Sequence, residues 1–162
     1  MSKYFNSNRC LAAVLCAAIV FPVELSLNAA AEEQDAARPT LADLMTLTQL
    51  RHFKLWYAQR LDNWKLANYE LDQFKTTIDR IVKLYPTTSA VTQADLVHEK
   101  TDPAMSELRK AIQDRNSSRF EAAYAQITDA CNQCHKAAGV DFIVVRVPTK
   151  SPFSNQNFNL KH

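Results

Sequence analysis

The whole 162-residue chain contains a single glycine, Gly139. Glycine is the residue that tight turns and bulges use most readily, and strand-like alternation of apolar and polar residues is scarce before Gly139. The composition is otherwise rich in alanine, leucine and glutamine, which are good helix formers. The chain is therefore expected to have an all-α fold.

The first helix is expected to begin after Thr40, a favourable N-cap residue, with Asp43 three residues later completing an acidic capping box. The periodicity weakens over 61–63, where we expect a tight antiparallel turn. Between these ends the helix carries apolar residues on two sides. One side holds Leu41, Leu44, Met45, Leu55 and Trp56, with Thr48 and His52 on the same stripe, and the other holds Leu47, Leu50, Tyr57 and Leu61. Periodicity alone does not decide which side faces the core.

The second helix has a regular pattern, because apolar residues recur three and four apart over 64–85, the spacing of a bundle seam. Pro86 is expected to end it. Residues 86–101 are expected to form a connection with a turn around 94–98, in which His98 is solvated.

The third helix is expected to open with Asp102 as its N-cap and Pro103 at the first helical position. Ser118 and Glu121 form a second capping box, which predicts the start of the fourth helix. Gly139 suits the C′ position that ends this helix.

Four amphipathic helices joined by mostly short loops predict an antiparallel four-helix bundle over residues 32–139. The sequence then changes character, because 142–147 is β-branched but has no partner strand with which to form a sheet. Residues 140–162 are therefore expected to form an extended tail packed on the bundle. Phe153 and Phe158 in this tail are expected to cover apolar surface near the cofactor edge.

The N-terminus has the pattern of a secretory signal peptide over residues 1–31. Lys3 and Arg9 supply the positive charge, 10–23 is an uncharged apolar run, and three alanines offer a cleavage site. The apolar run is short for a bilayer span, so a cleaved signal is favoured over an uncleaved anchor. Export to the periplasm is the expected result. The formal net charge of +2 is small, and nothing indicates a nucleic-acid partner.

The stretch with the most specific chemistry is Cys131-Asn132-Gln133-Cys134-His135. Two thiols three apart, followed by an imidazole, form the pattern for covalent attachment of haem c, with the histidine binding the iron. On a helix, positions i, i+3 and i+4 share one face, so all three side chains can reach one macrocycle. Signal cleavage would remove Cys10 and Cys16, leaving no cysteine for a disulfide framework. The alternatives are a redox dithiol, half of a zinc site or a plain disulfide.

A haem motif on the last of four helices resembles the class II, or cytochrome c′-type, cytochromes, over residues 40–139. That family often shows Arg, then Leu or Met four residues on, then Gly four later, on the helix over the distal haem face. Arg51 and Leu55 fit this pattern, whereas Gln59 stands at the glycine position and Gly139 stands where a basic residue is usual. The resemblance implies that Leu55 lies on the distal side. Arg51 is either a surface cation or a partner for a haem propionate, since a guanidinium matches a carboxylate fork.

The sixth coordination position of the iron decides between functions. His52 and Met45 are the candidate ligands, whereas Leu55 cannot ligate iron. A His or Met ligand gives a low-spin electron-transfer centre, and Met raises its potential. Met45 and His52 lie about 10 Å apart along the helix, so nearest-turn geometry permits only one of them. Without an iron bond, His52 is a hydrogen-bonding core histidine and Met45 is core filler.

We therefore expect a periplasmic monohaem c-type cytochrome that carries single electrons to and from periplasmic redox proteins, and a homodimer is compatible with this. One alternative is a five-coordinate haem protein that binds small gases such as nitric oxide. Another is a haem-free helical binding or structural protein. The sequence shows no Ser-His-Asp array, catalytic carboxylate pair or glycine-rich phosphate loop, so no enzyme activity is expected.

Overall fold

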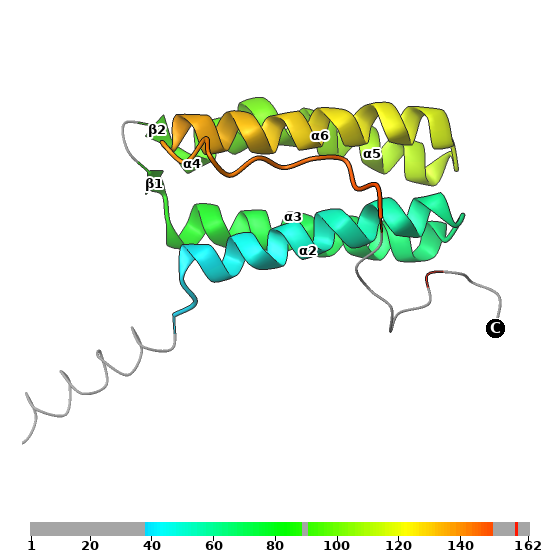
Figure 1. Cartoon of the computed structure of the whole chain (residues 1–162), viewed down its shortest axis with the longest axis horizontal. Coiled ribbons are helices and arrows are strands. Elements are labelled where there is room, and N and C mark those ends of the chain that lie inside the picture. The colour runs from blue at the N-terminus through cyan, green and yellow to red at the C-terminus, as the bar shows by residue number, and fades with distance from the viewer. Residues whose placement is uncertain (1–37, 89–90, 151–157, 159–162) are drawn as a thin grey trace, which may run out of the picture. The chain divides into compact units, whose positions relative to one another are not determined.

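The computed structural model describes residues 38–88, 91–150 and 158 (Figure 1). From Thr40 onward the described chain belongs to one compact unit. The expected signal peptide and Phe153 lie outside the described residues. Within the described part, no helix has both the length and the apolar character that crossing a bilayer requires.

Four long helices build this unit. They are α2 Leu41–Arg60, α3 Trp64–Leu84, α5 Asp102–Gln113 and α6 Ser117–Ala137. Helix α2 packs along α3 and α5 along α6, while contacts between α3 and α5 and between α2 and α6 join the two pairs. Successive long helices run in opposite directions, as the colour gradient in Figure 1 shows. The predicted all-α four-helix bundle is confirmed.

The capping box at the start of α2 forms as predicted, and a side chain also caps α3. At the start of α2, the Asp43 N–H donates to Thr40 Oγ1 at 3.1 Å, and the Thr40 N–H donates to Asp43 Oδ2 at 3.0 Å. After the turn, Asn63 caps α3 by accepting the Leu66 N–H at 3.0 Å. These side chains satisfy backbone donors that the first turn of a helix leaves without partners.

Gly139 ends α6 as predicted. Its φ of +74° lies in the left-handed region that favours glycine. The Gly139 N–H donates to the Lys136 carbonyl at 3.1 Å, and the Val140 N–H donates to the His135 carbonyl at 2.9 Å. This pair of bonds is a Schellman motif, and it turns the chain back at the end of the helix that carries the two cysteines.

The connection between α3 and α5 is more ordered than expected. Strand β1 Thr87–Thr88 pairs antiparallel with β2 Val91–Thr92. Helix α4 Gln93–Leu96 follows, and a π-helical turn, η1 Val97–Thr101, leads directly into α5.

The prediction that Asp102 is an N-cap is therefore wrong. Asp102 lies inside a continuous helical run, with φ −59° and ψ −42°, and its N–H bonds to the Val97 carbonyl. A π turn contains one more residue than an α turn. Pro103 then lies in the first turn of α5, where a proline is tolerated because its missing N–H would have no helical partner.

The cap of α6 also differs from the prediction. Asn116 is the N-cap, and its Oδ1 accepts the Arg119 N–H at 2.9 Å. Ser118 falls in the first turn of the helix, and Glu121 pairs with Arg60 at 3.0 Å rather than reaching back to the cap. Asn and Ser are nearly equivalent as N-caps, so the residue two positions earlier could take the role.

The structure decides which side of α2 faces the core. Leu44, Thr48, His52, Leu55, Ala58 and Gln59 are buried. Leu47 and Leu61, on the opposite side, are each 41% exposed. The inward stripe of α2 is thus partly polar, and Thr48 satisfies its hydroxyl by donating to the Leu44 carbonyl at 2.8 Å. This mixture explains why apolar periodicity could not identify the inner face.

Candidate functional site

Cys131, Cys134 and His135 lie on the last two turns of α6, where helical geometry places them on one face. Cys131 is partly buried and packs against the hydrophobic core. Cys134 lies against η1, where its side chain interacts with Thr101. Both cysteines are free thiols. The fold thus presents two reduced sulfurs on consecutive turns, one toward the core and one toward the π turn.

Both thiols are protonated at neutral pH. Burial raises the pKa of Cys131 to about 12, with a further contribution from Cys134. Burial also raises the pKa of Cys134, and this is opposed by a hydrogen bond from Thr101 and by the charge of Lys100. A redox dithiol needs a thiolate at working pH, so these environments weigh against that interpretation. Across residues 38–88, 91–150 and 158, no three His, Cys, Asp or Glu side chains gather as a metal site would require.

The ring of His135 is oriented by the chain that follows α6. Its Nδ1 lies 2.7 Å from the carbonyl oxygen of Ile143. A carbonyl can only accept, so the proton is on Nδ1, and in the neutral ring Nε2 keeps its lone pair. Histidine ligands of metals are usually held in this way, through the nitrogen that does not bind the metal. The arrangement prepares Nε2 as a donor atom.

The tail is attached to α6 by the residue that follows the first cysteine. Asn132 Nδ2 donates to the Val145 carbonyl at 3.0 Å, and the Val145 N–H donates to Asn132 Oδ1 at 2.8 Å. The tail then runs back along α6 (Figure 1). Asn132 was not predicted as a site residue, because an asparagine between two cysteines carries no signal of a partner thirteen residues later.

Phe158, predicted to lie near the cofactor edge, packs away from the two cysteines. Its backbone oxygen accepts from Asn63 Nδ2 at 2.9 Å, and its ring packs 5.9 Å from that of Tyr57. Asn63 caps α3 at the turn between α2 and α3, whereas the cysteines are at the opposite end of the bundle (Figure 1). Phe158 is buried there, with 4% exposure.

His52 is buried between α2 and α6, and both ring nitrogens contact hydroxyl groups of α6. Nδ1 lies 2.9 Å from the Tyr124 hydroxyl, and Nε2 lies 2.9 Å from Thr128 Oγ1. The Tyr124 hydroxyl also lies 2.7 Å from the His52 carbonyl, and Thr128 Oγ1 donates to the Tyr124 carbonyl. The single Thr128 hydroxyl proton goes to the Tyr124 carbonyl, so Thr128 Oγ1 accepts from the His52 ring at Nε2. The single Tyr124 hydroxyl proton goes to the His52 carbonyl, the nearer of its two partners. His52 can bind iron only if one of these contacts breaks.

The His52–Thr128 contact sets the relative level of α2 and α6. The two helices are antiparallel. A step toward the C-terminal end of α6 therefore points along the bundle in the same direction as a step toward the N-terminal end of α2. Seven residues make nearly two full turns and advance about 10 Å along the axis. Residues seven apart therefore lie on the same face of their helix. This step leads from Thr128 to His135 and from His52 to Met45. Leu55 is ten residues beyond Met45, about 15 Å from the level of His135.

Arg51 lies away from the cysteines and faces α3. Its Nη1 is 3.1 Å from Glu70 Oε2, and the Glu70 side chain is only 2% exposed. Glu70 was missed in the sequence, although it lies one turn before Phe74 on the inner side of the second helix. In the structure the Arg51 guanidinium therefore forms an ion pair with a buried carboxylate of the neighbouring helix. A propionate would have to compete with that carboxylate.

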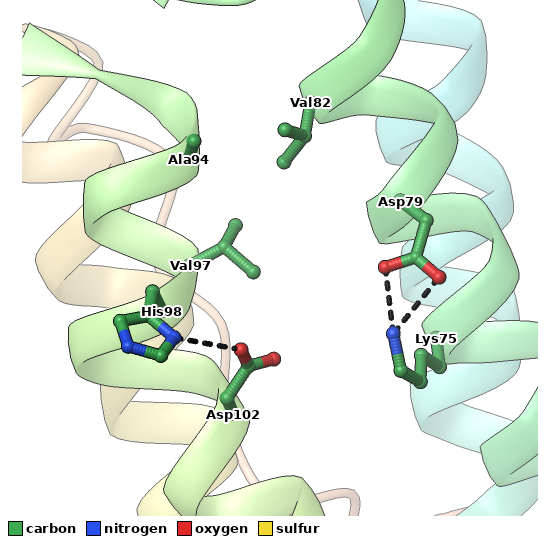
Figure 2. A pocket seen from close by; sticks show the side chains of 7 residues that line it. All are labelled: Lys75, Asp79, Val82, Ala94, Val97, His98 and Asp102. Carbon is green, nitrogen blue, oxygen red and sulfur yellow. Dashed lines mark hydrogen bonds and ion pairs between the residues drawn. The ribbon is translucent and has the colours of Figure 1, made fainter.

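A cavity of about 290 Å³ opens between α3 and the α4–η1 segment. Figure 2 shows that two charged pairs face each other across it, Lys75 with Asp79 and His98 with Asp102. The His98 side chain is 89% exposed, which confirms that it is solvated. Lys75 is an ion-pair partner of Asp79, and His98 Nδ1 lies 3.4 Å from Asp102 on the other side. The cavity does not include the cysteines.

Comparison with protein-family models, with curated proteins and with solved structures finds no match to this chain. The interpretation of the site therefore depends on its own residues and their geometry.

Acidification is expected to weaken the haem-free protein through His52. Burial lowers the pKa of His52 from 6.5 to about 4. Between these values the unfolded chain binds a proton that the folded chain excludes. The stabilisation is complete above about pH 6.5 and is lost as the pH falls toward 4, by about 3 kcal/mol in the free energy of unfolding. Urea unfolding across this pH range measures the loss.

His52→Gln is the control for this prediction, because glutamine keeps a hydrogen-bonding side chain and cannot titrate. Its free energy of unfolding is expected to be nearly constant between pH 6.5 and about 4.5, where most carboxyl groups stay ionised. Equal pH dependence in the wild type and in His52→Gln would contradict the assignment to His52.

Proposed function

We propose that Cys131, Cys134 and His135 hold one covalently attached haem c, and that the protein carries single electrons in the periplasm. The observation that supports this most strongly is the state of His135. Its Nδ1–H is held by the Ile143 carbonyl, so Nε2 is left as an electron-pair donor beside two free thiols. When bound, the haem supplies a reversible Fe(III)/Fe(II) couple.

The donor set fits this cofactor. Each thiol S–H adds across one vinyl double bond, so that sulfur gains a carbon and the neighbouring carbon gains the hydrogen. The addition would need no oxidant, because the hydrogen and the sulfur both end up on the former vinyl group. His135 on the same face provides the axial nitrogen. Cys131, packed against the hydrophobic core, and Cys134, beside Thr101, would hold the cofactor at this end of the bundle.

Met45 is the residue we propose as the sixth ligand. It lies two turns from His52 on the same face of α2 and at the level of His135, by the seven-residue step described above. It is also partly buried against the core. The ring nitrogens of His52 are both engaged by α6, and Leu55 is about 15 Å away along the axis. A thioether ligand raises the potential and favours electron transfer over gas binding.

Gas binding is the second candidate function. The engagement of His52 favours it, because without Met45 the neighbouring side chains at this level, Leu44 and Thr48, offer no strong iron ligand. In that case the iron would be five-coordinate and open to small neutral molecules.

The test is the optical and EPR spectrum of the exported, purified protein, with and without carbon monoxide. We expect haem that stays attached after acid-acetone extraction and low-spin iron that does not react with carbon monoxide. The ferric protein should show the long-wavelength band of an iron–thioether bond. Met45→Leu should abolish that band, lower the potential and permit carbon monoxide binding, whereas Met105→Leu, a thioether replaced in α5, should do none of these.

The outcomes separate the proposals. A purified exported protein without a Soret band would rule out haem attachment. Attached haem that is high-spin and reactive to carbon monoxide in the wild type would reject Met45 as ligand and support gas binding.

A further inference from the structure

We propose that residues 143–145, here called the proximal strap, position the iron ligand His135, and that Asn132 holds the strap in place. Asn132 clamps the backbone of Val145, which keeps the Ile143 carbonyl against His135 Nδ1. The role toward iron rests on the proposed function. The hydrogen-bonded device itself belongs to the protein chain and can be tested without the cofactor.

The strap is not held by its own side chains. Ile143 is 49% exposed and Val144 is 61% exposed, so these two side chains contribute little apolar burial, and the nearest core packing in the tail is that of Val147. The segment also lacks regular secondary structure. The Ile143 N–H donates to the Val140 carbonyl at 2.9 Å, which shapes a turn but does not attach it to α6. The two bonds between Asn132 and Val145 therefore provide the attachment next to His135.

Asn132 is suited to this task because its amide has the same donor and acceptor groups as a peptide unit. The two bonds, of 3.0 and 2.8 Å, form a closed pair resembling one rung of a β-ladder. Aspartate would lose the donor and alanine would lose both groups. The position between the two cysteines places the clamp on the turn of α6 that also carries the attachment site.

The clamp has two consequences for His135. It selects the tautomer with the proton on Nδ1, since the Ile143 carbonyl can only accept. It also makes the ring a stronger donor through Nε2, because an Nδ1–H that is hydrogen-bonded to a carbonyl leaves more electron density on the other nitrogen. A stronger donor stabilises Fe(III) relative to Fe(II) and lowers the potential. Through this hydrogen bond, the proximal strap would lower the midpoint potential of the iron.

The first test uses the haem-free protein and the ¹⁵N NMR shifts of the His135 ring. The wild type should show predominantly the Nδ1–H tautomer. Asn132→Ala should shift the population to the Nε2–H form that a free histidine side chain prefers. Val145→Pro, which removes the backbone donor to Asn132 but leaves the asparagine, should have the same effect. An unchanged tautomer in both variants would overturn the proposal.

Gln133→Ala is the matched control, because Gln133 is the other residue between the cysteines. Its side chain bonds to Asp129 of the same helix at 2.6 Å and not to the tail. It should keep the wild-type tautomer. If Gln133→Ala changed the tautomer as much as Asn132→Ala does, the effect would belong to the helix end and the clamp would be rejected.

The second test measures the midpoint potential of the exported protein. Asn132→Ala should shift the potential to more positive values with the same amount of attached haem per protein, and Gln133→Ala should not shift it. Loss of haem in every variant and in the wild type would contradict the proposed function while leaving the tautomer result valid. Attached haem with an identical potential in Asn132→Ala and wild type would contradict the tuning role.

Discussion

Replacing Cys131 and Cys134 together by alanine is expected to abolish covalent haem retention by the exported protein. Each proposed thioether depends on one of these sulfurs, and the expected signal cleavage would leave the chain with no other cysteine to replace them. Each single variant should keep one bond and lose a large part of its haem to acid-acetone. The measurement is the haem absorbance that stays with the polypeptide after denaturation, relative to protein concentration.

Cys10→Ala and Cys16→Ala are the controls for cysteine removal. Both residues lie in the apolar part of the expected signal peptide, where alanine is compatible with export. These variants should retain haem at the wild-type level. Full retention in both Cys131→Ala and Cys134→Ala would contradict attachment through these residues. Circular dichroism would show that the variants keep the helical fold, because each replacement removes only one sulfur from the end of α6.

Arg51→Met is expected to lower the free energy of unfolding of the haem-free protein by about 3–5 kcal/mol. Glu70 is almost completely buried, and Arg51 is the cation that faces it. Methionine keeps much of the volume and the flexible stem but leaves the carboxylate buried without a counter-ion. Removing one partner of a buried pair is costly because the other keeps its desolvation penalty. Urea unfolding at neutral pH measures the change.

Two further variants identify the cause of this loss. Arg51→Met combined with Glu70→Leu should recover most of the stability, because no buried charge remains. Lys75→Met removes an ion pair with Asp79 in which both side chains are at least half exposed, and should change stability by less than about 1 kcal/mol. If Arg51→Met were as mild as Lys75→Met, the pair would not be stabilising the bundle.

The features that the sequence predicted well depend on residues close together in the chain. The Thr40–Asp43 box and the left-handed Gly139 are examples, because their hydrogen bonds close within a few residues. The shared face of Cys131, Cys134 and His135 is another, since it follows from helical spacing alone. These interactions require only that a helix forms, and the composition strongly favours helices.

The features that were missed depend on partners distant in sequence. Asn132 meets the tail thirteen residues later, and His52 meets α6 seventy-two and seventy-six residues later. Asp102 was misassigned because a π turn upstream extends the helix through Pro103, and local propensity does not reveal such a turn. The contacts of Asn132 and His52 thus come from packing, whereas Asp102 is the exception, because its bond to the Val97 carbonyl is local.

The sequence by itself determined that this protein is a bundle of four helices and that its two C-terminal cysteines share a face with His135. Only the tertiary structure decided which side of α2 is buried, because that helix is apolar on both sides and partly polar within. Packing against α6 buries His52 with its hydroxyl partners, brings Met45 to the level of His135, and leaves Arg51 with Glu70. It also places the Ile143 carbonyl on His135, since that bond forms only after the chain has turned back at Gly139.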